Sequence, residues 1–342
     1  MGGIHLALIY GNKVLLYSGI NMNHDENINY SKVNCLNVSY FILFTVFVLG
    51  FLLSNSQYFG LSRDYENYKT IFSSGGSGVV LEPFYRLLMQ VFDTYEDIIS
   101  IVLVLAMCMK LRFIALYTKH NQALILFILY YISISIWVLD YTQFRNNLCI
   151  SILIFSVYFL FNKRKFEFYW SIIAAIATHW SAFPFLLLYP YVHNHKIRLL
   201  GNIMGGGVIL VYISGYAESL ILFIRSYDIG QKIGHGSNIN FINSLSLTFV
   251  AWYVLTFLSL TGKIKQIYSY FFLFAFLQYF VFVIFSLPVL AFRTLEMYFF
   301  IMVTIDLFIM RYKVLKLSLL GKLMIIFYLA FYYHVLFGVV NV

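Results

Sequence analysis

The chain has 342 residues, of which 61% are hydrophobic and only 11% are charged. A soluble core of this size cannot hide so much apolar surface, so the composition excludes a water-soluble protein and predicts an integral membrane protein. The net charge of +9 does not indicate nucleic acid as a partner, because the basic residues fall in short loops between apolar segments, where they set membrane orientation.

The apolar segments predict an all-α, polytopic membrane protein, because about 20 residues cross the hydrocarbon of a bilayer. We expect about 9–11 transmembrane or half-membrane helices. Residues 1–35 form a polar cytoplasmic tail, for which Met22 is an alternative start, and residues 36–342 form one membrane domain. The candidate segments are Leu36–Ser54, Ile98–Tyr117, Ala123–Leu139, Leu148–Phe161, Phe168–Val192, Leu199–Gly215, Leu245–Leu260, Tyr268–Leu287, Leu295–Met310 and Leu320–Val340.

The loop after the first segment, residues 55–97, contains a polar island at Leu61–Leu88. Within it, Glu82–Phe92 has the apolar spacing of an amphipathic helix in the membrane interface, and Pro83 suits a helix start. Its predicted apolar face consists of Phe84, Leu87, Leu88 and Val91. On the orientation that follows, this loop and a second loop at 216–244 lie outside the cell.

The segment Phe168–Val192 is interrupted by THWS, with His179 inside it, and Pro184 follows. If every segment crossed fully, the later basic loops would lie outside, which the positive-inside rule disfavours. A re-entrant pair of half-helices with His179 near its tip restores the rule. It assigns 16 of the 23 Lys and Arg to the cytoplasmic side, Lys110 and Lys322 among them. Non-helical backbone at membrane depth needs protein or a wet cavity around it, so a cavity beside His179 is expected.

On this orientation several ionisable residues share the external half of the membrane. Charges near hydrocarbon are costly, so their convergence predicts a polar cavity or a charged ligand. The alternative is that each snorkels or forms an interfacial ion pair, and His179 alone could be a structural histidine. Arg145 and Arg293 head their segments, and planar guanidinium groups suit pyrophosphate oxygens. The set is Arg63, Asp64, Arg86, Asp140, Arg145, His179, Arg225 and Arg293.

The chain has no glycine-rich phosphate loop, nucleotide fingerprint or lipase-type serine motif, so we expect no cofactor and no nucleotide as energy source. His193 and His195 are interpreted as solvated loop residues and no metal site is expected. Cys35, Cys108 and Cys149 have neither paired nor metal-ligand spacing and are expected to be buried free thiols. An enzyme of this composition would take a donor already activated on a lipid.

A series of short motifs follows in order: RDYENY, EPFYRLL, Arg145 before an apolar span, a KRK turn, ATHWSAFPFLLLYP, and Arg293 close to Tyr298. This order resembles the EpsG-type and Wzy-type polysaccharide polymerases over roughly Leu61–Tyr298. The external loop with its interfacial helix also resembles C-type glycosyltransferases.

The resemblance implies a glycosyltransferase that joins oligosaccharide repeat units linked to undecaprenyl pyrophosphate. It would act at the periplasmic face of the bacterial inner membrane, in O-antigen (lipopolysaccharide), capsule or exopolysaccharide biosynthesis, with a chain-length regulator as a further partner. The rivals are a flippase for the same lipid-linked sugar and a membrane acyltransferase. A flippase predicts symmetric halves with broken helices, and the sequence shows one broken segment and no symmetry.

The expected site combines these motifs with the chemistry of glycosyl transfer, which needs a base for the acceptor hydroxyl and charge stabilisation for the leaving pyrophosphate. Asp64 is the first candidate for the base and His179 the second. Arg145, Arg293 and Arg86 are the expected pyrophosphate ligands. The remaining substrate-binding candidates are Arg63, Tyr68, Glu82 and Tyr298.

Overall fold

The computed structural model describes residues 44–45, 48–49, 52, 65–73, 82–118, 121–140, 143–213, 243–284, 288–309 and 316–333. Within these ranges the regular elements are helices and no strand occurs, which confirms the all-α prediction. They are α2 (Tyr65–Ser73), α3 (Pro83–Val91), α4 (Tyr95–Tyr117), α5 (Asn121–Tyr130), η2 (Tyr131–Asp140), α6 (Phe144–Phe161), α7 (Lys165–Thr178), η3 (Trp180–Leu187), α8 (Leu188–His193), α9 (His195–Ile213), α12 (Ser244–Ser259), α13 (Gly262–Ile284), α14 (Pro288–Ile309) and α15 (Lys316–Phe331).

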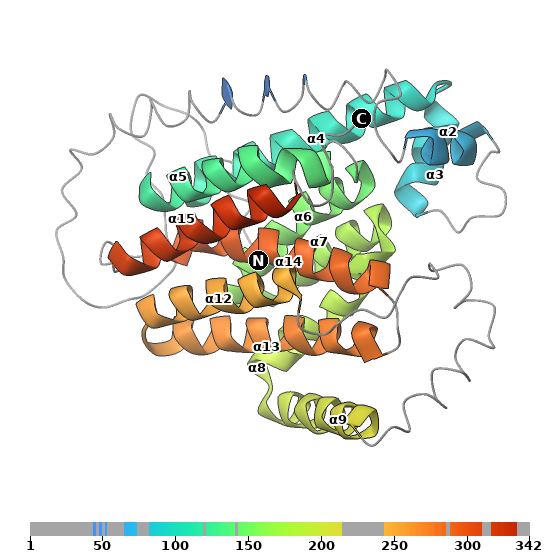
Figure 1. Cartoon of the computed structure of the whole chain (residues 1–342). Coiled ribbons are helices and arrows are strands. Elements are labelled where there is room, and N and C mark those ends of the chain that lie inside the picture. Colours follow the sequence, from blue (N-terminus) through green and yellow to red (C-terminus); the bar gives the residue numbers. More distant parts are fainter. Residues whose placement is uncertain are drawn as a thin grey trace, which may run out of the picture.

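Most of these helices form one bundle (Figure 1). α5, α15, α12 and α13 lie side by side in that order, while α9 lies at the edge, against α8 and α13. α14 is the central helix, because it contacts α4, α5, α6, α12 and α13. Its residues from Met297 to Ile309 are buried on every side, as expected for a helix that is apolar all round.

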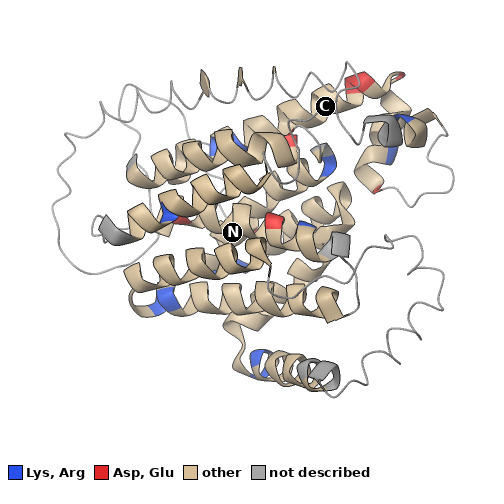
Figure 2. Ribbon diagram, viewed as in Figure 1, with Lys and Arg blue, Asp and Glu red and all other residues tan. Residues whose placement is uncertain are grey.

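Three helices of the described part are long and apolar enough to cross a membrane, namely Tyr95–Tyr117, Gln122–Asp140 and Gly262–Ile284. Shorter apolar helices cover Arg145–Phe161, Ser244–Ser259 and Ser318–Phe331. The ribbon is mostly uncharged along the bundle (Figure 2). Length and composition thus support a polytopic membrane protein.

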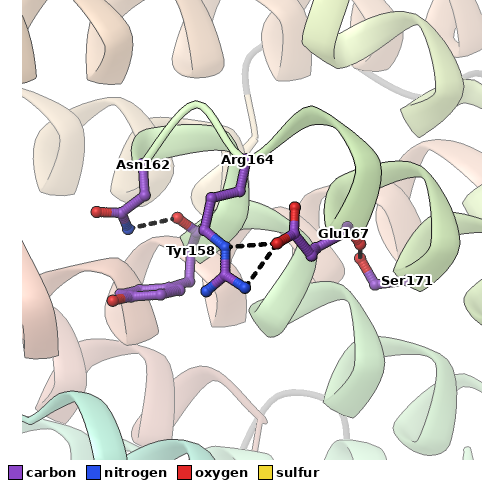
Figure 3. Close-up of polar contacts among 5 residues, drawn as sticks. All are labelled: Tyr158, Asn162, Arg164, Glu167 and Ser171. Carbon is purple, nitrogen blue, oxygen red and sulfur yellow. Dashed lines mark hydrogen bonds and ion pairs between the residues drawn. The ribbon is translucent and has the colours of Figure 1, made fainter. Parts of the chain in front are cut away.

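The turn between α6 and α7 is built from the basic KRK motif (Figure 3). Lys163 has φ 59, and the amides of Lys163 and Arg164 donate to the carbonyls of Leu160 and Phe159, at 3.1 and 2.9 Å. This is the Schellman pattern that ends a helix. Arg164 then donates from Nε and Nη2 to Glu167 Oε1, at 2.9 and 2.7 Å. A backbone hydrogen bond, and after it the Arg164 side chain, hold the pKa of the Glu167 carboxyl below its ordinary value.

The helix break predicted in Phe168–Val192 is present at His179, which has φ −161 and ψ 128. There α7 ends and the 3-10 helix η3 begins. The chain then returns toward its starting level, because Tyr189 Oη donates to the Lys163 carbonyl, at 3.1 Å. Nε2 of His193 lies 3.1 Å from the Leu160 carbonyl. That both ends face one side of a membrane remains a prediction.

His193 is half-buried and bonded to the end of α6, so its interpretation as a solvated loop residue is wrong. The return of the broken segment brings it there, and this long-range contact has no local signal. His195 is exposed, as expected, but it is the first residue of α9 and not part of a loop. Cys149 is buried as expected, whereas Cys108 is exposed on the outer face of α4, which contradicts the expectation for this thiol. Cys35 lies outside the described residues.

Two ion pairs are sealed inside the bundle. Lys110 Nζ lies 3.1 Å from Asp140 Oδ1, and both side chains have 0% exposure; Asn147 also donates to Asp140. Lys322 Nζ lies 2.7 Å from Asp306 Oδ2, with exposures of 0% and 1%. The assignment of Lys110 and Lys322 to cytoplasmic loops is therefore wrong, since pairing lets each lysine lie within a helix.

α15 packs against α12 at Gly321. A Cβ on Gly321 would lie 2.8 Å from Leu255 Cδ1, nearer than ordinary contact allows. One turn earlier on α15, Ser318 Oγ donates to the Leu255 carbonyl, at 3.0 Å. A larger residue at position 321 would therefore require the Leu255 side chain or one of the two helices to shift.

Candidate active site

The helix predicted in the external loop is present as α3. Pro83 is its first residue and Glu82 is its N-cap, the position where proline is favoured. The predicted apolar face is divided, because Leu88 packs inward while Leu87 and Val91 are 56% and 64% exposed. An exposed apolar stripe on a helix at the end of the bundle is typical of an interfacial helix.

An ion pair connects α3 to α6. Glu82 Oε2 lies 2.9 Å from Arg145 Nη1, and the side chains are 3% and 16% exposed. The Arg145 guanidinium also lies over the Tyr85 ring, 5.7 Å from its centroid, and Tyr85 is buried. Arg145 is therefore oriented by a carboxylate and an aromatic face of α3 while part of it stays accessible.

Arg145 and Arg293 both lie near His179. His179 is partly exposed at the break between α7 and η3, and both Arg145 and Arg293 act on it electrostatically. The Ser181 amide donates to His179 Nδ1, at 3.1 Å. The structure thus brings together Arg145, His179 and Arg293, three residues predicted from distant parts of the sequence.

A second group of polar side chains continues this cluster on α14. Glu296 lies one turn after Arg293, which acts on it electrostatically. Gln143 Nε2 donates to Glu296 Oε2, at 3.2 Å, and Tyr333 Oη donates to Glu296 Oε1, at 2.9 Å. Asn146 Nδ2 in turn donates to Gln143 Oε1, at 3.0 Å. α6, α14 and α15 therefore meet at this end of the bundle.

Tyr298 lies beneath the cluster and not within it, contrary to its predicted contact with substrate. Its side chain has 0% exposure, and its hydroxyl donates to Gln278 Oε1, at 2.7 Å. The ring stacks on Phe185 of η3, with centroids 4.9 Å apart. The reason is the rotation of α14, which turns Tyr298 inward, so that it supports the broken segment by packing.

Six other predicted residues are not part of the described cluster. Arg86 is exposed on α3, away from the buried Tyr85 and Leu88. Asp140 is buried with Lys110, so its expected place beside an open cavity is wrong. Arg63, Asp64, Arg225 and the side chain of Tyr68 lie outside the described residues.

Gln143, Asn146, Glu296 and Tyr333 were not among the residues predicted to have a function. Glu296 had a usable signal, because a carboxylate in an apolar helix, one turn from an arginine, needs a polar partner. Tyr333 had none, since it is one of 29 tyrosines and its contact with Glu296 joins positions 37 residues apart.

The accessible part of the cluster is suited to an anion. Two guanidinium groups supply planar donors, and a histidine supplies a further ring nitrogen at the same site. Only Glu82 is in an ion pair with either arginine among the described residues. In that same part of the chain, no group of three His, Cys, Asp or Glu side chains could hold a metal ion.

The fold is that of a polytopic helical membrane protein, and the polar cluster lies at one end of its bundle. The family model described as the EpsG family matches residues 40–341. The chain therefore belongs to the EpsG family, as its motifs indicated. Searches among curated proteins and among solved structures find no match.

Proposed function

We propose that the protein polymerises oligosaccharide repeat units carried on undecaprenyl pyrophosphate. The donor is a growing glycan on this carrier, and the acceptor is a single repeat unit on the same carrier. The reaction takes place at the periplasmic face of the bacterial inner membrane and supplies O-antigen, capsule or exopolysaccharide. Membership of the EpsG family supports a polysaccharide polymerase.

The observation that carries the proposal is the convergence of Arg145, Arg293 and His179 at one end of the bundle. In glycosyl transfer the carrier pyrophosphate leaves with the electron pair of the broken bond. Guanidinium groups stabilise that charge best, because their fork of donors matches phosphate oxygens. Arg145 and Arg293 would bind the pyrophosphate, and His179 would donate to it or to the acceptor.

The interfacial helix α3 supports a substrate that arrives in the membrane. Leu87 and Val91 are exposed on α3, and Glu82 at its start holds Arg145. A polyprenyl chain running along this apolar face would bring its pyrophosphate to Arg145. The geometry therefore favours a lipid-linked donor over a soluble one.

The charge distribution supports an external site. α6 begins at the cluster with Arg145 and ends at the basic turn of Lys163, Arg164 and Lys165. The positive-inside rule assigns that basic turn to the cytoplasm. The cluster at the opposite end of α6 then faces the periplasm.

The flippase remains the second candidate, because the break between α7 and η3 is of the kind that transporters use at their substrate sites. A functional assay separates the candidates. The purified protein, reconstituted in liposomes with lipid-linked repeat units, is expected to lengthen the glycan, as seen on a polysaccharide gel. Relocation of single units without lengthening would identify a flippase, and a new ester would identify an acyltransferase.

A further inference from the structure

Glu296 differs from the other acidic residues that pack within the described bundle. The carboxylates of Glu82, Asp140 and Asp306 each lie within 4.0 Å of a lysine or arginine nitrogen. Glu296 has no such ion pair among the described residues, although it is only partly exposed. An ion pair lowers the proton affinity of a carboxylate. Glu296 has no such pair, so it can accept a proton from another group more readily.

Two neutral donors hold Glu296 in place. Tyr333 donates to Oε1, at 2.9 Å, and Gln143 donates to Oε2, at 3.2 Å. The side chain of Gln143 is itself fixed by Asn146, at 3.0 Å. These bonds orient the carboxylate without neutralising it, and each oxygen retains a lone pair for a further donor.

The groups that act on Glu296 come from three parts of the chain. Arg293 acts from α14 itself, Tyr130 from α5, and Tyr332 and Tyr333 from the two positions that follow α15. Tyrosine is neutral near pH 7, so Arg293 supplies the permanent charge among them. Among these groups, Glu296 is therefore the one that changes charge near or below neutral pH.

His179 is poorly placed to be the base. Its Nδ1 accepts the hydrogen bond of the Ser181 amide, at 3.1 Å. A neutral imidazole with an accepting Nδ1 carries its proton on Nε2, so the free ring nitrogen is a donor. Arg145 and Arg293 nearby also oppose a further positive charge on the ring.

We infer that Glu296 is the general base for the acceptor hydroxyl, and this inference rests on the proposed polymerase function. The acceptor oxygen forms a bond to the anomeric carbon of the donor while its proton passes to a Glu296 oxygen. The bond from that carbon to phosphate breaks, and undecaprenyl pyrophosphate leaves with the electron pair beside Arg145 and Arg293. The proton on Glu296 is later released to water.

The test compares Glu296→Gln with the control Glu167→Gln. Glu167 is in the first turn of α7, next to the end of α6 that lies away from the cluster. Elongation of lipid-linked repeat units is measured against pH, together with binding of undecaprenyl pyrophosphate and thermal unfolding. Glu296→Gln is expected to lower the elongation rate about 10²- to 10⁴-fold with binding and unfolding temperature retained. Glu296→Asp is expected to keep part of the rate and to displace the acidic limb of the pH profile. Glu167→Gln is expected to match wild type in elongation rate, pH profile and binding.

Three results would overturn the inference. The first is a wild-type rate and pH profile in Glu296→Gln. The second is loss of the acidic limb in Asp64→Asn while Glu296→Gln retains it. The third is an acidic limb of the pH profile that is unchanged in Glu296→Asp. This result decides the question if Glu296→Gln does not fold. If wild-type protein lengthens no glycan, the polymerase proposal itself fails and the inference with it; if wild type is active and Glu296→Gln equally so, only the inference fails.

Discussion

Two groups of charged residues lie within this bundle, and they are arranged in opposite ways. The pairs Lys110–Asp140 and Lys322–Asp306 match one cation to one anion with at most 1% exposure. The cluster of Arg145, Arg293 and His179 stays partly exposed, although Glu82 pairs with Arg145 and Glu296 lies one turn after Arg293. Intramembrane charge alone therefore does not identify a candidate site in this protein, whereas partly exposed charge does.

The largest effect is expected from breaking a sealed pair. Lys322→Ala leaves Asp306 buried without its cation, which costs about 3–5 kcal/mol, and should lower the unfolding temperature and the yield of detergent-solubilised protein. The double variant Lys322→Leu, Asp306→Leu removes both charges and should recover most of that loss. Glycan elongation by the double variant should be normal, and a loss of elongation there would contradict the structural interpretation of this pair.

The next effect is expected from the accessible arginines. Arg145→Ala and Arg293→Ala should each lower elongation about 10²- to 10³-fold, because a donor to the leaving charge is lost. Their unfolding temperatures should stay close to wild type. Arg145→Lys keeps the charge but not the planar fork and should recover only part of the rate. Arg112→Ala, exposed on α4, is the control, and normal glycan ladders from both site variants would refute the anion site.

The helical framework follows from the length of the apolar runs, and the break at His179 follows from the polar residues THWS within one of them. Pairings across the bundle could not be predicted in the same way. Lys110 and Asp140 are 30 residues apart, and hydropathy places a lysine near a helix end in the loop. The partner that lets it lie inside is known only once α4, η2 and α6 are packed together.

The site shows the same limit. Arg145, Arg293 and His179 were predicted because guanidinium and imidazole are rare in apolar segments and therefore conspicuous. Tyr298 was assigned to the site by proximity to Arg293 in sequence, yet it is turned into the core. Gln143 and Tyr333 are uncharged, so only their shared contact with Glu296 identifies them.

A smaller effect separates the two contributions of His179. Its Nδ1 caps η3, and its Nε2 is free to donate to a ligand. His179→Asn retains a capping acceptor, whereas His179→Ala loses the cap and about 1 kcal/mol of stability. Both variants should lose elongation activity, and only His179→Ala should unfold at a lower temperature. Equal activity in wild type and His179→Asn would show that His179 only caps η3 and does not act on the substrate.

The smallest effect is expected at the exposed pair of Arg164 and Glu167, which are 48% and 37% exposed. Because the pKa of Glu167 is lowered in the folded protein, its contribution to stability is present above the ordinary pKa of glutamate and is lost as the pH falls through the lowered value. Water screens such a pair, so the contribution is small. Unfolding temperatures of wild type and Glu167→Gln should differ slightly at neutral pH and converge in acid.

The contact at Gly321 connects stability to chemistry over a long distance. Gly321 lets α15 lie against Leu255 of α12, and Tyr333 follows twelve positions later on the same stretch of chain, where it bonds Glu296. A side chain at position 321 would force Leu255 or the helix to shift, and a shift of α15 would move Tyr333 with it. The alignment of the carboxylate thus depends on a packing contact that substrate never touches, so loss-of-function substitutions in this protein are expected on α12 and α15 as well as around the arginines.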